Sequence, residues 1–284
     1  MSDLPELRQR IDALDGELLR LLNERTQIAR EIGVIKSRES LPIYSPDREM
    51  KLLRSLVERS EGPLRPEAIR AIYREIMSAA LAVEKDVAIA CVGPMGSPTY
   101  QAALGKFGSS VRYTFSAEIA GVFEEVSSER ADCGVVLLED PAHGLVNQTL
   151  DALAQNDLSI CAEIIPDRDA ADSRATERYL VLGCQPNAHS GHDQTMLMLR
   201  IEDKPGTLVS ALEPFKELGI NLNHFASRPA PKGSDDIFFF VEADGHTRDL
   251  QLKDLFRELS KNCRAVKVLG SYPKSDSALS REDG

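Results

Sequence analysis

The residues that could do chemistry begin with a cation in an apolar row. Arg25 lies between Leu21 and Ile28, where the four-three spacing of the row would otherwise place a hydrophobic side chain. A buried guanidinium is costly unless an anion compensates its charge. Arg25 therefore needs a carboxylate, which either an acidic neighbour in a structural ion pair or a bound anionic ligand could supply.

Two more cations accompany the same row. Arg8 and Arg25 would be roughly 25 Å apart along a helix axis, too far to bind one small molecule from the same helix. In an antiparallel pair of such helices, Arg8 of one chain could approach Arg25 and Lys36 of the other. The two chains would then share a cationic pocket that suits a small dicarboxylate.

A carboxyl group closes a second apolar stripe. Tyr73, Met77, Ala80 and Glu84 follow one another at helical spacing. A glutamate at a helix end is commonly solvated, but this one continues an otherwise apolar stripe. Glu84 is thus either a surface group or a further polar member of the pocket.

Three helices must position these side chains. The apolar spacing from Leu7 to Lys36 predicts a first helix of roughly 33 residues, about 50 Å long. The helical segment, residues 1–86, is too short to cover so long a helix by itself. The helix therefore needs a partner, and we expect this to be a second copy of the chain. A second helix opens at Ser45, and a third runs from Pro66 to about Lys85.

This N-terminal sequence resembles a known family. The run ELRQRIDALDGELLRLLNERTQIAREIGVIK, followed by PIYSPDRE and AIYREIMSAALAVE, resembles the all-helical class of chorismate mutase, as found at the N-terminus of bifunctional chorismate mutase/prephenate dehydratases. The resemblance spans residues 1–86 and implies an intertwined dimer of three-helix chains. It also implies that chorismate rearranges to prephenate, which requires no metal, cofactor or nucleophile, but a compact substrate conformer and a stabilised ether oxygen.

The resemblance assigns roles to several polar residues. Arg25 and Arg8 of the partner subunit would bind the two substrate carboxylates. Lys36 would face a carboxylate and the ether oxygen. Arg48 would lie in the pocket wall, and Glu49 would accept a hydrogen bond from the ring hydroxyl.

Three further positions complete this predicted site. Glu84 falls where relatives have a Gln or Glu that donates to the ether oxygen, and a glutamate must be protonated to donate. We therefore expect activity to fall as rising pH removes that proton. Ser45 replaces a common Asp, and Ala80 replaces a Ser that binds a substrate carboxylate. Neither departure removes the central cations, so we expect catalysis.

Composition limits the other possibilities. The 284 residues, 42% of them hydrophobic, predict two or three packed domains. The net charge of −11 and the lack of a basic, aromatic-rich stripe argue against nucleic acid as a partner. The five cysteines lack CxxC spacing, and the sequence contains neither a signal peptide nor an apolar run that could cross a membrane. We expect a cytoplasmic protein with reduced thiols.

Residues 87–184 predict an α/β domain. Buried strands are expected at VAIACV, CGVVLLE, ICAEII and RYLVLG, and helices over Tyr100–Lys106 and residues 144–153. The loop Gly93–Thr99 lacks the Walker lysine and the full dinucleotide fingerprint, which argues against a nucleotide site. This loop and residues 134–150 resemble instead the prephenate dehydratase domain.

The dehydratase resemblance is eroded and short. The family's acidic-amide-hydroxyl triplet reads Glu139–Pro141, and its Thr-Arg-Phe motif reads Glu177–Tyr179 unless it is shifted by one residue to Thr176. Only residues 154–176, with a loop-like end from Pro166, stand where the family has an entire second lobe. Because a site between two lobes needs both walls, we expect dehydratase activity to be lost. The remaining half-domain would be a spacer or a binding module for a regulatory ligand or partner.

The C-terminal residues predict a regulatory domain. Residues 185–193 form a linker, residues 194–272 have the strand and helix order of a ferredoxin-like α+β fold, and residues 273–284 form a disordered tail. The run DKPGTLVSALEPFKELGINLNHFASRP resembles an ACT domain of the phenylalanine-sensing kind, which binds its ligand between paired domains. The implied effector-binding residues are Gly206, Thr207, Leu208, Val209, Asn221, Ser227, Arg228 and Pro229.

These residues leave the effector open. Their alternative role is to maintain the fold, as Gly206 does by allowing a tight turn. Thr207 and Ala226 replace residues common in the family. We expect an amino-acid effector, with phenylalanine as allosteric inhibitor, and a possible higher oligomer through paired ACT domains.

Three functions follow from these observations. The preferred one is a dimeric chorismate mutase of phenylalanine biosynthesis, regulated at its ACT domain and without dehydratase activity. The first alternative is a bifunctional enzyme that still forms phenylpyruvate. The second is a non-catalytic protein that binds aromatic amino acids or a partner enzyme, although such a protein has no physical reason to keep cations on an apolar helix face.

Overall fold

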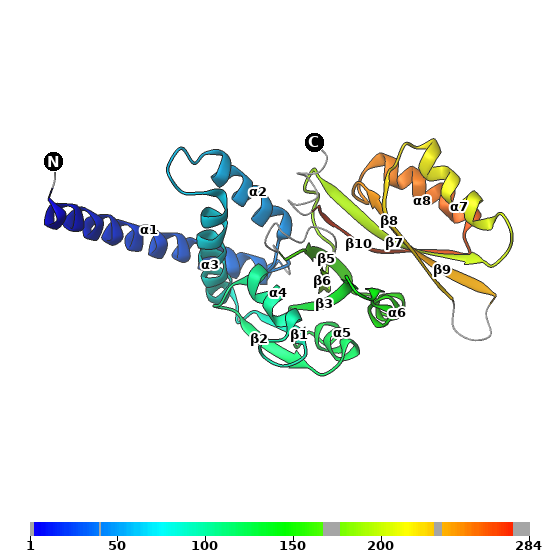
Figure 1. The fold of residues 1–284 in the computed structure, drawn as a ribbon, viewed down its shortest axis with the longest axis horizontal. Coiled ribbons are helices and arrows are strands. Elements are labelled where there is room, and N and C mark those ends of the chain that lie inside the picture. The colour runs from blue at the N-terminus through cyan, green and yellow to red at the C-terminus, as the bar shows by residue number, and fades with distance from the viewer. Residues whose placement is uncertain (1–2, 40, 167–176, 230–234, 275–284) are drawn as a thin grey trace.

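Three structural parts follow one another along the chain (Figure 1). The computed structural model describes residues 3–39, 41–166, 177–229 and 235–274. The helical part contains α1–α3, the middle domain contains β1–β6 with α4–α6, and the C-terminal domain contains β7–β10 with α7 and α8. This architecture confirms the predicted succession of all-α, α/β and α+β parts. The whole loop-like stretch after Pro166, which ends at Thr176, and residues 275–284 of the predicted tail lie outside the described residues.

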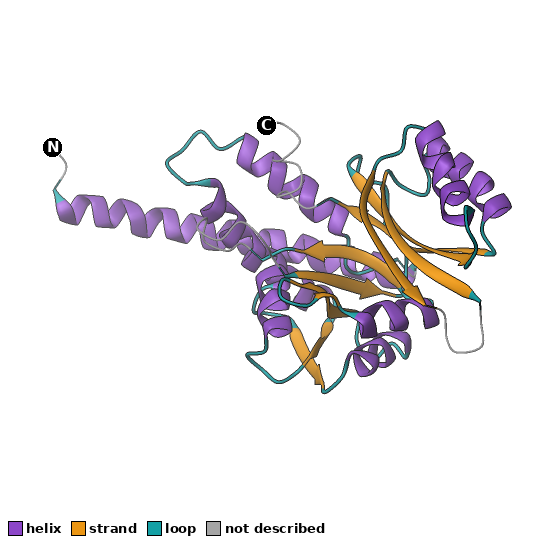
Figure 2. Cartoon of the chain, turned by 45° about the vertical axis from the view of Figure 1, so that its right-hand side comes forward, coloured by secondary structure: helices purple, strands orange, loops and turns teal. Residues whose placement is uncertain are grey.

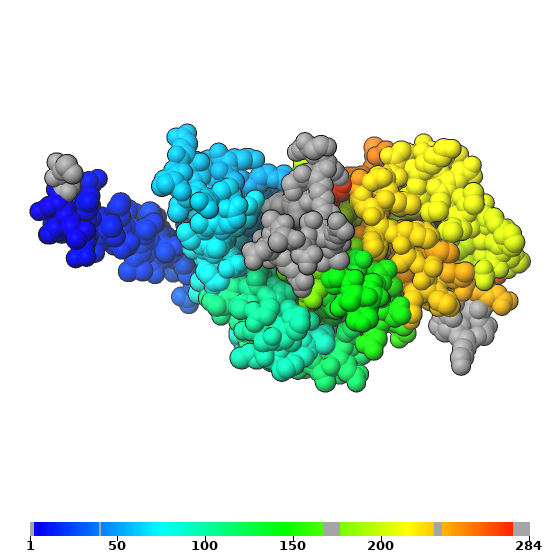
Figure 3. All heavy atoms as spheres, viewed as in Figure 1, coloured from blue at the N-terminus to red at the C-terminus, as the bar shows by residue number. Residues whose placement is uncertain are grey.

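The first helix is long and only partly covered. α1 (Leu4–Arg38) begins at Asp3, whose carboxylate accepts a hydrogen bond from the backbone of Glu6 at 2.9 Å. Its N-terminal half stands clear of the rest of the chain (Figure 3), and every residue from 3 to 24 is exposed. The exposed residues include much of the predicted apolar row: Leu7, Ile11, Leu14, Leu18 and Leu21. None of the described helices, α1 included, carries an apolar run that could cross a membrane.

The C-terminal half of α1 packs against α3 (Pro66–Glu84), which follows α2 (Pro46–Glu58). Gly33 allows this close approach, because a Cβ at that position would lie 2.9 Å from the Cα of Glu84. Ser45 occupies the N-cap position of α2 as predicted, but its side chain makes no capping hydrogen bond to the described residues.

The middle domain is built on one mixed sheet. Its strands lie in the order β2 (Arg112–Ser116), β1 (Ala88–Val92), β3 (Cys133–Asp140), β6 (Arg178–Gly183) and β5 (Ser159–Ile164). β2, β1 and β3 are parallel, whereas β6 runs antiparallel to both β3 and β5. The predicted helix over residues 144–153 was placed too early, because Gly144–Leu145 pair with the end of β3 as β4.

Helices cover both faces of this sheet. α4 (Pro98–Phe107) packs on one face, together with Ile43, Tyr44 and Leu81 from the helical part. α5 (Ile119–Ser127) and α6 (Asn147–Gln155) pack on the other face. The middle domain therefore shares a hydrophobic core with the helical part.

The C-terminal domain has the predicted ferredoxin-like order. β7 (Asp193–Glu202), α7 (Thr207–Glu217), β8 (Leu222–Pro229), β9 (Asp236–Asp244), α8 (Leu250–Asn262) and β10 (Ala265–Pro273) follow one another along the chain. The strands form an antiparallel sheet in the order β10-β7-β9-β8. α7 and α8 cover one face of the sheet (Figure 2), and the other face packs against the middle domain.

The contact between the middle and C-terminal domains is close. Gly270 of β10 has a φ of +155° and lies against the backbone of Ile160 in β5, where an added Cβ would overlap the Ile160 carbonyl. Residues of both domains share one buried cluster, which includes Ile160, Leu180, Leu182, Met196, Phe240, Leu269 and Tyr272.

A buried ionic cluster joins the same two domains. Arg178 lies 2.5 Å from Glu163 and 2.8 Å from Glu242, and the Tyr272 hydroxyl donates to Glu242 at 2.9 Å. The side chains of Glu163 and Glu242 are only 3% and 2% exposed. Burial raises the pKa of Glu163, and the nearby charge of Glu242 adds to this effect while Arg178 opposes it. One guanidinium thus compensates two buried carboxylates, with Glu139 at 3.5 Å as a weaker third.

Candidate active site

A cavity of about 510 Å³ opens where α1 meets α2 and α3. Apolar side chains such as Ile32, Leu52 and Met77 form much of its wall. Seven of the eight predicted mutase residues line it: Arg25, Lys36, Ser45, Arg48, Glu49, Ala80 and Glu84. Arg8 is absent from this cavity because it lies on the exposed N-terminal half of α1.

Lys36 and Glu84 form an ion pair at the crossing of α1 and α3. The Lys36 Nζ lies 3.0 Å from the Glu84 Oε2, and it also donates to the backbone carbonyl of Ile43 at 2.8 Å. Both side chains are largely buried, with 18% and 10% exposed. The cation and the carboxyl group that the sequence predicts at one substrate atom therefore lie side by side.

Arg25 and Arg48 carry the other positive charges of the cavity. Neither forms an ion pair with any residue that the structure describes. The structural ion pair considered for Arg25 is thus not seen within the described part of one chain. Two guanidinium groups on an apolar wall are available to an anionic ligand.

Glu49 has a partner that was not predicted from the sequence. The Glu49 Oε1 lies 3.1 Å from the Nζ of Lys106, which belongs to α4 of the middle domain. Tyr44, beside Glu49, has a hydroxyl that is buried without a hydrogen-bond partner among the described residues. Burial raises the pKa of Tyr44 well above its usual value, and the charge of Glu49 adds to the effect. No local pattern could predict the pair of Glu49 with Lys106, because these two residues are far apart in the chain.

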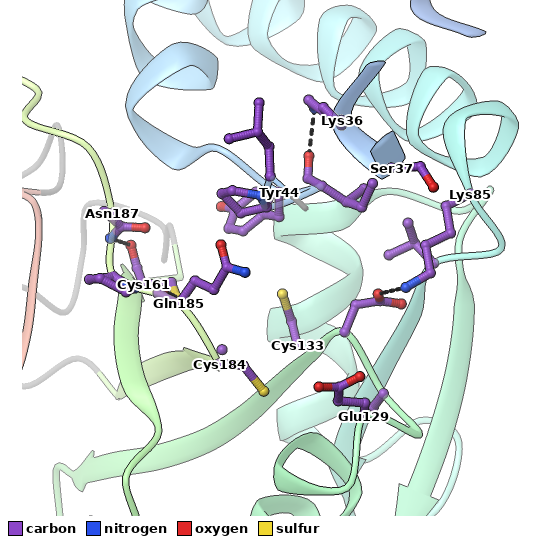
Figure 4. Close-up of a pocket in the computed structure, with 18 residues that line it drawn as sticks. Lys36, Ser37, Tyr44, Lys85, Glu129, Cys133, Cys161, Cys184, Gln185 and Asn187 are labelled. Atoms are coloured by element: carbon purple, nitrogen blue, oxygen red, sulfur yellow. Dashed lines mark hydrogen bonds and ion pairs between the residues drawn. The ribbon is translucent and has the colours of Figure 1, made fainter. Parts of the chain in front are cut away.

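A second cavity, also of about 510 Å³, adjoins the first (Figure 4). Lys36, Leu41, Ile43 and Tyr44 line both cavities, so the loop after α1 separates them. The second cavity also exposes thiols, and burial raises the pKa of Cys161 to about 12. A thiol with such a pKa stays protonated near neutral pH and is a poor nucleophile.

The predicted effector residues do not gather in one cavity of a single chain. Gly206 has a φ of +88° at the start of α7, and the Thr207 hydroxyl donates to the carbonyls of Glu202 and Lys204 at 2.8 Å. Ser227 and Pro229 line a separate cavity of about 430 Å³ with several carboxylates.

The other predicted effector residues have different surroundings. Arg228 lies 2.5 Å from Asp151 of α6, so it joins the C-terminal domain to the middle domain. The Asn221 side chain donates to Asn223 at 2.8 Å. Leu208 packs at the margin of the domain core, whereas Val209 is 71% exposed.

Models of known families match the same three parts of the chain. Family models match in order, with chorismate mutase type II over residues 7–85, prephenate dehydratase over residues 89–167 and an ACT domain over residues 195–261. The fold and these matches thus define the class: a helical domain of the chorismate mutase type, joined to a short prephenate-dehydratase-like domain and an ACT domain.

Relatives that match nearly the whole chain identify the family. The bifunctional chorismate mutase/prephenate dehydratase of Aquifex aeolicus is 34% identical over 358 aligned positions, covering 97% of this chain and 99% of the relative. The chain belongs to the bifunctional chorismate mutase/prephenate dehydratase family. The protein of that name from Pseudomonas aeruginosa is 29% identical, with 96% and 98% coverage. Since the Aquifex alignment has 358 positions and this chain only 284 residues, part of the relative has no counterpart here.

Solved structures support the fold of the last two parts. Prephenate dehydratase from Streptococcus mutans is 29% identical, with a TM-score of 0.57, covering 66% of this chain and 97% of that one. Prephenate dehydratase from Arthrobacter aurescens in complex with L-Phe is 21% identical, with a TM-score of 0.59 and coverage of 69% and 97%. The similarity to the Arthrobacter structure indicates only that the two proteins share a fold.

Proposed function

We propose that the protein is a chorismate mutase that converts chorismate to prephenate. One observation carries this proposal: Arg25, Lys36, Arg48, Glu49 and Glu84, which lie on three helices, meet in one largely apolar cavity. The reaction breaks the ether C–O bond as a C–C bond forms, without transfer to the enzyme. A site of fixed cations and hydrogen-bonding groups can hold the compact conformer and stabilise charge at the ether oxygen.

The five polar groups act on three parts of the substrate: a carboxylate, the ether oxygen and the ring hydroxyl. Arg25 binds one carboxylate, and Arg48 borders the same anionic end of the cavity. Lys36 and Glu84 act at the ether oxygen, which is consistent with their 3.0 Å separation. Glu49 accepts the hydrogen bond of the ring hydroxyl.

The site is completed by a second copy of the chain. The apolar row on the first half of α1 is exposed in a single chain, and burying such a row stabilises a helix pair. An antiparallel partner would cover this row and bring its own Arg8 to the cavity. We therefore propose a homodimer with two shared sites.

We further propose that dehydratase activity has been lost. β5 pairs directly with β6, so residues 165–177 only join two neighbouring strands and are too few to form a second lobe. The remnants of the motifs serve the fold. Ser97 caps α4 by accepting from the backbone of Tyr100 at 3.3 Å, and Asp140 accepts hydrogen bonds from the backbone of Ala142 and His143.

We propose that an amino acid, phenylalanine or a close analogue, regulates the enzyme at its C-terminal domain. A prephenate dehydratase of similar fold has been solved with L-Phe. Ser227 and Pro229 line a cavity together with Glu202 and Lys204, whose carbonyls accept hydrogen bonds from Thr207, so this cavity lies beside the start of α7.

The experiment that tests this function is turnover of chorismate by the purified full-length protein. We expect prephenate as the only product. Arg25→Ala should abolish turnover, whereas Arg20→Ala should not, because Arg20 lies off the apolar row of the same helix and pairs with Glu17 and Glu24. Phenylpyruvate as a product would establish the bifunctional alternative. Absence of turnover together with binding of an aromatic amino acid would favour the non-catalytic one.

A further inference from the structure

The middle domain contacts Glu49, a residue that lines the proposed mutase cavity, through the side chain of Lys106. Lys106 lies in the last turn of α4, and its Nζ is 3.1 Å from the Oε1 of Glu49. Only 25% of the Lys106 side chain and 15% of the Glu49 side chain are exposed. Such a sheltered ion pair is screened less by water and salt than a pair on the surface.

Packing fixes the end of α4 against the helical part. The Tyr44 and Phe107 rings lie 4.9 Å apart, next to Glu49 and Lys106 respectively. On the side of α3, both the backbone and the hydroxyl of Ser109 donate to the Glu75 carboxylate, at 3.0 and 2.7 Å. The position of Lys106 relative to the cavity is therefore set by contacts on both sides.

The charges of the cavity indicate a role for the Lys106 cation beside Glu49. Lys36 compensates Glu84 at 3.0 Å, but no cation of the helical part lies within ion-pair distance of Glu49 among the described residues. An uncompensated Glu49 carboxylate would repel a substrate with two carboxylates, and it would compete with that substrate for Arg48. The ammonium group of Lys106 removes both effects.

We propose that Lys106 is a positioning residue of the mutase site. It orients the Glu49 carboxylate toward the substrate's ring hydroxyl and cancels its charge, so that Glu49 accepts a hydrogen bond without repelling the substrate. The inference rests on the mutase function proposed above. It also gives the middle domain a part in the mutase reaction, as the support of one wall of the cavity.

The test compares three substitutions in the full-length enzyme. Lys106→Met should raise KM for chorismate about tenfold while kcat changes by less than about threefold, because ground-state binding is affected most. Lys106→Arg should restore KM to near the wild-type value. Lys85→Met is the matched control, since Lys85 pairs across the same domain boundary with Asp132, which does not line the mutase cavity. Its KM should stay close to that of the wild type.

A double-mutant cycle separates positioning from general support of the fold. In a Glu49→Gln background the carboxylate is gone, so Lys106→Met should have no further effect on KM. An equal loss in both backgrounds, or an unchanged KM in Lys106→Met alone, would overturn the inference. Thermal unfolding checks each variant, and Lys106→Gln replaces Lys106→Met if the latter does not fold. A wild-type protein without mutase turnover would instead refute the proposed function, and the inference would fall with it.

Discussion

The Nζ of Lys36 lies 3.0 Å from the Oε2 of Glu84, and this ion pair joins the last turn of α1 to the last residue of α3. Gly33, one turn before Lys36, lets the two helices approach closely, because no Cβ separates its backbone from Glu84. The geometry of the proposed site at the ether oxygen thus depends on a glycine that does not itself line the cavity.

Gly33→Ala should therefore damage both the site and the fold. The new Cβ would lie 2.9 Å from the Glu84 Cα and carbonyl oxygen, so the helices must separate. We expect the unfolding free energy to fall by about 1–3 kcal/mol, which is the usual cost of overpacking a core. Mutase activity should fall by about tenfold or more. Gly16→Ala is the control, because nothing lies within 4 Å of a Cβ there. Urea unfolding and turnover that are alike in the two variants would contradict this account.

Glu84 should act through a hydrogen bond to the ether oxygen. A glutamine at this position can donate that bond, whereas an alanine cannot. We expect Glu84→Gln to remain active and Glu84→Ala to lose about a hundredfold in kcat. The measurement is kcat for the two variants and the wild type. If Glu84→Ala turned over chorismate as fast as Glu84→Gln, Glu84 would have no such role.

Two inactive variants should restore activity to each other. In an antiparallel dimer, each site combines Arg25 of one chain with Arg8 of the other. A mixed dimer of Arg8→Ala and Arg25→Ala chains then has one site with both arginines and one with neither. Random mixing should recover about a quarter of the wild-type activity, since about half of the dimers are mixed and each has one intact site.

The measurement is turnover after the two variants are unfolded and refolded together. Each variant refolded alone, at the same total concentration, is the control. If the mixture is no more active than the two controls, Arg8 and Arg25 do not come from different chains.

Glu163→Gln should stabilise the protein at neutral pH. Burial raises the pKa of Glu163 in the folded state. With respect to Glu163, the folded protein is therefore most stable at a pH where this residue is protonated, and it loses stability as pH rises through that pKa. Glutamine cannot ionise and leaves Arg178 paired with Glu242. We expect a gain on the order of 1 kcal/mol near pH 7, which disappears in acid below the ordinary pKa range of glutamate.

Arg178→Met provides the contrasting change. It leaves the buried carboxylates of Glu163 and Glu242 without their cation, which should cost about 3–5 kcal/mol. Urea unfolding at two pH values distinguishes the cases. Should Glu163→Gln destabilise the protein as much as Arg178→Met does at neutral pH, Glu163 contributes favourably as an ion, contrary to this interpretation.

Periodic and local features of the fold could be predicted from the sequence. The apolar spacing placed α1, Ser45 and Pro66 marked the starts of α2 and α3, and the strand and helix order of the C-terminal domain was predicted correctly. β2 and α5 were not predicted, and Gly144–Leu145 were assigned to a helix. The error at Gly144 arose because this short strand depends on pairing with Asp140 rather than on its own sequence.

Much of the candidate site could also be predicted, but not its connections between domains. Seven of the predicted residues meet in one cavity because they lie on the inner faces of three amphipathic helices. The pairs Glu49–Lys106 and Arg228–Asp151 join residues of different domains. Such contacts depend on how the domains pack, which no periodicity of a single sequence records.

The junction of β5 and β6 has a wider consequence. Ile164, the last residue of β5, pairs with Tyr179 near the start of β6, so the chain leaves the sheet and returns to it at neighbouring points. Where two chain ends lie side by side, a whole lobe can be gained or lost without changing the register of the strands around it. At this edge of the sheet, a second lobe and its catalytic activity can be present or absent while the rest of the fold stays the same.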